Sequence, residues 1–230
     1  RKNDSLLHFV KPVFDRRVFL KTCTNGSSEL MTNLSMSLVN ALYNLQLMKI
    51  AGENGVAAYG AVMYVNFIFV ATFLGYAIGC APVISYHYGA GNHAELKNLY
   101  KKSMSIILVW GVILFGAAQL LAPVLSKIFV GYNTGLYAMT LHGFRVYAIA
   151  FLIIGINIFG SSFFTALNNG LISAVISFLR TLMFQVIMVL TLPLWFGING
   201  IWSAISVAEA LTLIMTTTFF VRQKDKYHYL

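Results

Sequence analysis

Long apolar runs separated by short polar turns dominate the chain. Uncharged stretches of roughly 20 residues or more cover 30–48, 54–92, 103–126, 146–179 and 181–208, and about 20 apolar residues are enough for one helix to cross a membrane. Turns rich in glycine and asparagine divide these stretches further. The pattern predicts six transmembrane helices, over 27–50, 56–88, 103–129, 135–166, 171–195 and 201–221.

This pattern predicts an all-α integral membrane fold, a bundle of six transmembrane helices. We expect three parts: a basic amphipathic cytoplasmic linker over 1–26, a six-helix lobe over 27–221 and a cytoplasmic tail over 222–230. Residues 8–21 mix bulky apolar and basic side chains, which favours a segment lying on the anionic inner leaflet over an ordinary solvated connector. The first 21 residues lack an apolar central stretch, so no signal peptide is expected.

Composition supports a lipid environment. Of the 230 residues, 58% are hydrophobic and 10% are charged, whereas a soluble domain carries about 25% charged residues. The net charge is +9, but the basic residues lie in short connectors, which is typical of membrane topology and not of nucleic-acid binding. Twelve Lys and Arg fall on the side of the two termini and only Lys49 and Lys127 on the other, so both termini are expected in the cytoplasm.

A polar stripe follows the first predicted helix. Five residues recur every three or four positions and fall within about 40° of one direction around the helix axis: Glu29, Asn33, Ser37, Asn40 and Asn44. Such a stripe favours the wall of a substrate cavity, and the alternative is hydrogen bonding between helices. Glu29 lies in the first turn, where it could couple to an ion or only complement the helix dipole.

Further polar and special residues lie in the other predicted helices. Asn66 in helix two, Asn157 in helix four and Gln185 in helix five are candidate pathway residues. Pro82 is a candidate hinge, because proline frees a backbone carbonyl. Gly75 and Gly79 have the spacing of a close helix–helix contact.

Three charged residues, Arg145, Arg180 and Glu209, are expected near the middle of the membrane. An unpaired charge there is costly, so we predict a structural ion pair between Arg180 and Glu209. Arg145 is the competing partner of Glu209, and a cavity or gating role is the alternative for all three. No group of residues has metal-ligand spacing, no nucleotide-binding loop or catalytic constellation is present, and the two cysteines predict no disulfide framework. We therefore expect no enzyme activity, no metal and no cofactor.

Several segments resemble the multidrug and toxic compound extrusion (MATE) family, nearest to its bacterial multidrug-efflux branch. They are GSSELMTNLSMSLVNALYNLQL (26–47), GVAAYGAVMYV (55–65), APVISYHYGAGN (81–92), SSFFTALNNG (161–170) and FGINGIW (196–202). The most specific is 81–92, with its proline and its Tyr-rich end followed by Gly-Ala. The resemblance covers nearly all of this chain but only the second, C-terminal half of a family member.

The resemblance implies one lobe of a twelve-helix, two-lobe antiporter that exports cationic or amphipathic drugs or metabolites in exchange for H⁺ or Na⁺. It implies an N-terminal six-helix lobe as partner, contact with membrane lipid and a place in the bacterial cytoplasmic membrane. It further implies that the two lobes rock, so that a central cleft opens to one membrane face and then to the other. The helices expected at this cleft carry Asn33, Asn40, Asn44, Asn66, Asn157 and Gln185. Some family branches carry an acid in the helix matching 135–166, where this chain has none, so the coupling carboxylates could lie in the other half.

Two other functions are compatible with the sequence. A flippase of related fold for lipid-linked precursors would need several cations along its cavity, and only Arg145 and Arg180 are available. A structural membrane subunit without transport activity would not need a polar stripe.

Overall fold

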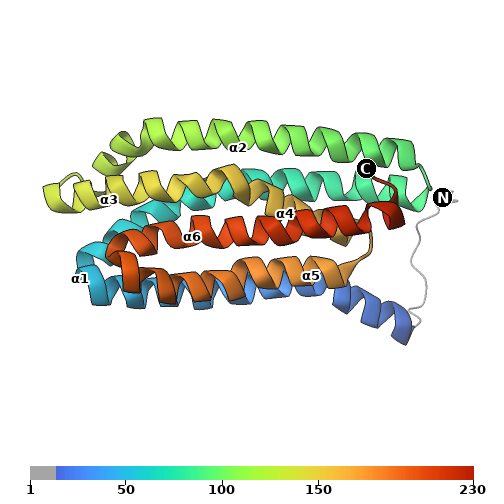
Figure 1. Cartoon of the computed structure of the whole chain (residues 1–230), viewed down its shortest axis with the longest axis horizontal. Coiled ribbons are helices and arrows are strands. Elements are labelled where there is room, and N and C mark those ends of the chain that lie inside the picture. Colours follow the sequence, from blue (N-terminus) through green and yellow to red (C-terminus); the bar gives the residue numbers. More distant parts are fainter. Residues whose placement is uncertain (1–13) are drawn as a thin grey trace, which may run out of the picture.

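The computed structural model describes residues 14–230, without the side chains at 25, 28, 29, 31 and 32, and these residues form a bundle of long helices (Figure 1). The elements are α1 (Arg16–Gly89), α2 (His93–Val130), α3 (Thr134–Tyr147), the short 3₁₀ turn η1 (Ala148–Ala150), α4 (Phe151–Ala166), α5 (Gly170–Phe178), the π-helical turn η2 (Leu179–Met183) and α6 (Phe184–Tyr227).

Two of these helices reverse direction at a glycine. Gly52 in α1 has φ 64° and Gly197 in α6 has φ 55°, a left-handed conformation that glycine adopts without steric cost. We call 16–51 and 53–89 the first and second arms of α1, and 184–196 and 198–227 those of α6. Figure 1 shows both reversals at the same end of the bundle. They fall in the turns that the sequence predicted at 52–55 and 196–200.

The turns alternate between the two ends of the bundle. At the end opposite the reversals, Asn169 at the start of α5 donates to the Tyr227 hydroxyl at 2.9 Å, and the rings of Tyr88 and Tyr227 lie 5.6 Å apart. At the other end, His142 of α3 and Asn199 of α6 are joined by a hydrogen bond of 2.7 Å. The start of α1 and the C-terminus therefore share one end, as the predicted topology requires (Figure 1).

Among the described residues, four helical stretches are long and apolar enough to cross a membrane: 33–89, 93–130, 134–166 and 170–227. The first and last have 57 and 58 residues, and because each reverses at a glycine, each is long enough for two crossings of about 20 residues. The structure thus agrees with the apolar segments predicted from the sequence.

The ends of the predicted segments differ from the structure at three places. The helix that was expected to begin at 27 begins at Arg16, where the Asp15 side chain accepts from the amide of Arg17 at 2.8 Å. Residues 1–13 of the predicted linker lie outside the described residues. The helix expected at 103 begins at His93 behind an Asn92 cap, and α6 continues through Tyr227 instead of ending at 221.

The C-terminal residues return to the bundle. His228 adopts a left-handed conformation that ends α6, and the Tyr229 ring is fully buried. Its hydroxyl donates to the Phe220 carbonyl at 2.8 Å, and its ring lies 5.0 Å from Phe163 and 5.1 Å from Tyr100. Part of the predicted tail is therefore packed as core.

Helix α4 lies at the centre of the bundle, and glycines allow its neighbours to approach. A side chain at Gly155 would meet Phe73 and Ile107, and one at Gly160 would meet Thr216. In contrast, no atom of the described residues lies within 4 Å of a Cβ built at Gly75 or Gly79. The close approach predicted at those two glycines is therefore wrong within this chain, because both lie on an exposed face of α1.

Candidate functional site

A cavity of about 260 Å³ is lined by both arms of α1, the end of α3, α4, η2 and both arms of α6. It opens to the surface of the bundle, because Met36 and Phe67 of its wall are 43% and 68% exposed. Most of its wall is apolar, formed by side chains such as Met36, Met63, Phe67, Val70, Leu74 and Ile158. The remaining wall is polar, and it includes Arg180 and Glu209. An apolar cavity with a few polar groups at one side has the usual composition of a small-molecule site.

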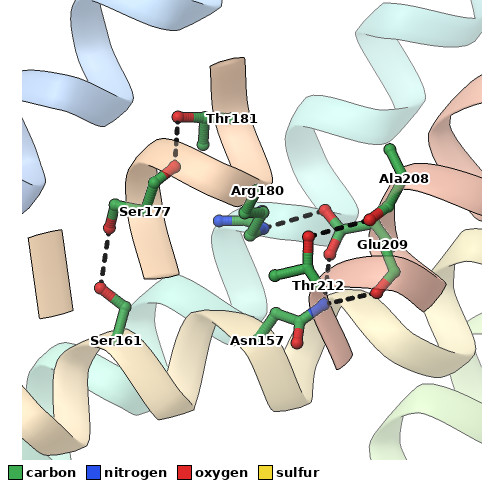
Figure 2. Close-up of polar contacts among 8 residues, drawn as sticks. All are labelled: Asn157, Ser161, Ser177, Arg180, Thr181, Ala208, Glu209 and Thr212. Carbon is green, nitrogen blue, oxygen red and sulfur yellow. Dashed lines mark hydrogen bonds and ion pairs between the residues drawn. The ribbon is translucent and has the colours of Figure 1, made fainter. Parts of the chain in front are cut away.

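The predicted contact between Arg180 and Glu209 is present at this polar side. The Arg180 Nε lies 2.9 Å from Glu209 Oε1, with 13% and 1% of the two side chains exposed. Asn157 of α4 donates through Nδ2 to Glu209 Oε2 at 2.7 Å and to the Glu209 carbonyl at 3.0 Å. Figure 2 shows Arg180 and Asn157 reaching Glu209 from two sides. Both carboxylate oxygens are thus hydrogen-bonded.

The backbone around Arg180 departs from a regular α-helix. Residues 179–183 form one π-helical turn between α5 and α6. Thr181 in this turn donates to the Ser177 carbonyl at 2.7 Å (Figure 2). Such turns insert an extra residue into a helix and are frequent at functional sites. Here the turn carries the two η2 residues that line the cavity, Arg180 and Thr181.

Three tyrosines form part of the wall on the side of α1 and α3. The Tyr59 hydroxyl donates to Asn40 Oδ1 at 2.9 Å, and the Tyr43 and Tyr59 rings stack at 5.0 Å. Tyr147 lines the cavity from the end of α3. Sequence reasoning missed these residues, because tyrosine on an apolar helix is read most easily as core. For Tyr59 and Tyr147, no signal in the sequence distinguishes the two roles.

Some polar atoms around the cavity lack a hydrogen-bond partner. The Tyr43 hydroxyl, Asn66 Oδ1 and Asn157 Oδ1 are buried without one among the described residues. Buried polar atoms without partners are rare in folded proteins, because leaving one unpaired costs about 1–3 kcal/mol. Two of these side chains, Tyr43 and Asn66, belong to the cavity wall.

The structure brings together only some of the predicted pathway residues. Asn40, Asn66 and Gln185 line the cavity. Asn157 lies behind Glu209 and holds its carboxylate, so its contact is with the ion pair and not with the cavity. The Glu29 side chain lies outside the described part of the chain.

The rest of the polar stripe lies away from this cavity. Asn33, Ser37 and Asn44 are exposed on the first arm of α1 and are not part of the wall, although Asn40 is. Asn40, at the centre of the stripe, contacts the second arm of α1, because its Oδ1 accepts the hydrogen bond from Tyr59. Whether the exposed members line a pathway stays a prediction.

Arg145 and Pro82 also lie outside the cavity wall. Arg145 is exposed on α3, and the structure gives it no ion pair with Glu209, so its predicted competing pairing is wrong. Its carbonyl accepts a hydrogen bond from Gln119 at 3.0 Å. Pro82 is exposed, and the second arm of α1 continues as a helix through it. The hinge role of Pro82 stays a prediction.

Metal-binding residues do not gather in the described part of the chain, where no group of three or more His, Cys, Asp or Glu is arranged to hold an ion. Cys23 is exposed and Cys80 is half-buried, and both are free thiols. Glu209 is the only buried carboxylate among the described residues.

The fold is similar to solved transporter structures. A MATE structure in the bent conformation superposes with a TM-score of 0.88 at 19% identity, covering 98% of this chain and 50% of that one. An outward-facing multidrug resistance MATE family transporter of the MOP superfamily gives 0.85 at 19% identity, covering 94% and 48%. A MOP superfamily transporter from Pyrococcus furiosus, whose binding pocket is described as having reverse polarity, gives 0.85 at 19%, covering 94% and 49%.

These likenesses establish the fold, and the chain spans about half the length of each of the three structures. No curated protein matches the sequence. The sequence model of the MatE family, however, matches residues 30–191, which is more than half of the chain. The match covers both arms of α1 and continues through α2, α3, α4 and α5 into the first arm of α6. This multi-pass helical membrane protein therefore belongs to the MatE family of transporters.

Proposed function

We propose that this chain is one lobe of a secondary active antiporter that exports drugs or metabolites in exchange for H⁺ or Na⁺ by alternating access. The observation that carries the proposal is the cavity between the helices, with the Arg180–Glu209 pair on its wall. An apolar bundle needs no such cavity for packing, and polar groups at this depth of a membrane protein mark substrate or ion pathways. The partner is a second six-helix lobe, because the similar structures are about twice as long.

The same cavity favours an antiporter over a flippase of lipid-linked precursors. A flippase would use several cations along its cavity, but of Arg145 and Arg180 only Arg180 belongs to the wall. The one buried carboxylate of the described residues, Glu209, is already paired with Arg180. We therefore place the main ion-coupling carboxylates in the partner lobe.

Ion-coupled transport is the direct test. Everted membrane vesicles containing the whole transporter are given candidate substrates, while a pH-sensitive or a sodium-sensitive dye reports ion movement. We expect substrate-dependent ion flux, and its loss in the neutral double variant Arg180→Gln with Glu209→Gln. If no drug or metabolite moves either ion in vesicles that contain folded protein, the chain is not part of an antiporter.

We also propose that both termini face the cytoplasm of a bacterial inner membrane. The described basic residues Lys97, Lys101, Lys102, Arg222, Lys224 and Lys226 belong to the end of the bundle that holds the C-terminus. Positive residues concentrate on the cytoplasmic side of membrane proteins. A cysteine at position 133 is then labelled from outside and one at 98 is protected, and the reverse pattern contradicts this orientation.

A further inference from the structure

The guanidinium of Arg180 has hydrogen-bonding capacity that the protein does not use. Only its Nε is bonded, to Glu209 Oε1 at 2.9 Å. No further hydrogen bond joins this guanidinium to the described residues. Its Nη atoms are also not fully buried, so they are accessible from the cavity that Arg180 lines. Figure 2 shows a terminal nitrogen of Arg180 pointing away from Glu209. Four of the five N–H donors of the side chain are therefore available to a ligand.

The two charges of the pair are not equally accessible. The Arg180 side chain is 13% exposed, whereas that of Glu209 is 1% exposed. Glu209 also has both oxygens engaged, one by Arg180 and the other by Asn157 at 2.7 Å. A ligand that reaches this side of the cavity meets the guanidinium first. A cationic ligand would have to displace Arg180 before it contacted the carboxylate.

The remaining wall suits an apolar body. Met36, Met63, Phe67 and Leu74 also line the cavity. Gln185, five residues after Arg180 in the sequence, also lines the cavity. Its side-chain amide has no hydrogen-bond partner among the described residues and is a further polar group for a ligand. The cavity thus presents a planar fork of N–H donors beside an apolar chamber of about 260 Å³.

We infer that this cavity binds an amphipathic carboxylate, whose carboxylate docks on the Nη groups of Arg180 and whose apolar body lies against the methionine and phenylalanine side chains. The guanidinium fork matches the geometry of a carboxylate, with two parallel N–H···O bonds. This inference rests on the proposed transport function and names its substrate class. The carboxylate can belong to a simple anion or to a zwitterion, because both present the same group to Arg180.

Three probes with the same phenyl ring and two-carbon chain separate the possibilities: phenylpropionate (anion), phenylalanine (zwitterion) and phenethylamine (cation). Equilibrium binding to the whole transporter in lipid nanodiscs, without any ion gradient, is measured by calorimetry. We expect phenylpropionate or phenylalanine, or both, to bind at least about tenfold more tightly than phenethylamine, the factor that one charge-assisted contact supplies. Tighter binding of phenylalanine identifies the zwitterion and tighter binding of phenylpropionate the anion.

Variants of the pair test the role of Arg180, and the double variant does so without leaving a stranded charge. The neutral double variant Arg180→Gln with Glu209→Gln should lose the preference for the carboxylate by about tenfold or more. Glu209→Gln alone keeps the guanidinium and removes the opposing charge, so the folded fraction of this variant should bind phenylpropionate more tightly than the unaltered protein does. Arg222→Gln, which removes an exposed arginine far along α6, is the matched control and should change nothing.

Equal or tighter binding of phenethylamine overturns the inference. So does a double variant that keeps the carboxylate preference, or the failure of all three probes to bind folded protein. Because binding is measured without a gradient, these results are independent of the ion-flux test. Ion-coupled transport without carboxylate binding would leave the antiporter standing and remove this substrate class, and carboxylate binding without ion flux would do the reverse.

Discussion

Helix α4 lies at the centre of the bundle, whereas the first arm of α1 lies along one side of it. The stretch 134–166 is 67% buried over its most apolar window. Among the described side chains of the first arm of α1, only Ser35, Val39, Tyr43 and Leu47 are buried. Both contain polar residues within apolar sequence. In α4 they are paired: Asn157 bonds Glu209, and Ser161 bonds Ser173 and Ser177 at 2.9 and 2.8 Å. In the first arm of α1, Ser37 and Asn44 are exposed.

This difference teaches that a polar residue in a membrane helix has one of two roles, and that burial decides which. At the centre, a buried polar side chain gains from a partner within the chain, as Asn157 and Ser161 do, because an unpaired polar group in a membrane bundle is costly. On the side of the bundle, the same side chain is left for a cleft, a second lobe or lipid headgroups. The four experiments below are ordered from the largest expected effect to the smallest.

Breaking the central ion pair should have the largest effect. Glu209→Ala or Arg180→Ala alone leaves an unpaired buried charge and should lower the free energy of unfolding by about 3–5 kcal/mol. The double alanine variant should lose less than either single variant, because no charge is stranded. Denaturant unfolding in detergent measures all three, with the exposed Glu53→Ala as control. Additive losses would show that the two residues do not interact.

Changing a glycine to alanine should lower the free energy of unfolding at the centre of the bundle and raise it on the side. A Cβ at Gly143 would lie 2.6 Å from the buried ring of Trp202, so Gly143→Ala should cost about 1–3 kcal/mol through overpacking. Gly75→Ala meets open space and should stabilise its helix by about 0.5–1 kcal/mol. Denaturant unfolding in detergent measures the change in both variants. A loss at Gly75 would mean that another part of the whole transporter, such as the partner lobe, packs closely there.

The serine contacts between α4 and α5 should have a smaller effect. Ser173 is fully buried, donates to the Ser161 carbonyl at 2.8 Å and contacts the Thr165 hydroxyl at 2.6 Å. Ser173→Ala should therefore lower the unfolding free energy by between about 0.6 and 1.7 kcal/mol. Ser37→Ala removes a serine hydroxyl from an exposed position and should leave the unfolding free energy unchanged. Equal losses would contradict the distinction between the two regions.

The last experiment tests whether the side of the bundle faces water or lipid, and no change in stability is expected. In a variant without Cys23 and Cys80, a cysteine at Asn44 should react with a water-soluble thiol reagent, whereas one at Leu38 should not. Both positions are exposed on the first arm of α1, so burial cannot cause the difference. Water on one face, with lipid or the partner lobe on the other, can. Equal labelling would rule out a water-filled cleft along the stripe.

Much of the fold could be predicted from the sequence, because the length of each apolar segment and the glycines in its turns are local features of the chain. The apolar segment predicted over 135–166 is helical over 134–166, as α3, η1 and α4, and the reversal glycines fall in the predicted turns. The contact between Arg180 and Glu209 was also predictable. Two opposite charges at similar depth in a low-dielectric bundle have few other partners.

The candidate site was predictable only in part. Asn40, Asn66 and Gln185 were expected on the pathway and line the cavity, but Asn157 holds the ion pair from behind. The tyrosines of the wall and the glycines at the close contacts, such as Gly143 and Gly155, were not expected.

The sequence by itself determined which segments are helices and where they reverse, and it limited the partner of Glu209 to Arg180 or Arg145. Hydrophobic length, glycine conformation and the cost of a buried charge can all be read without knowing how the helices pack. Only the tertiary structure decided that Asn40 faces Tyr59 while Ser37 and Asn44 stay exposed, and that Arg180 presents its free donors to an apolar chamber. Helical periodicity fixes the direction of a side chain around its own axis. What lies in that direction depends on how the helices pack against one another.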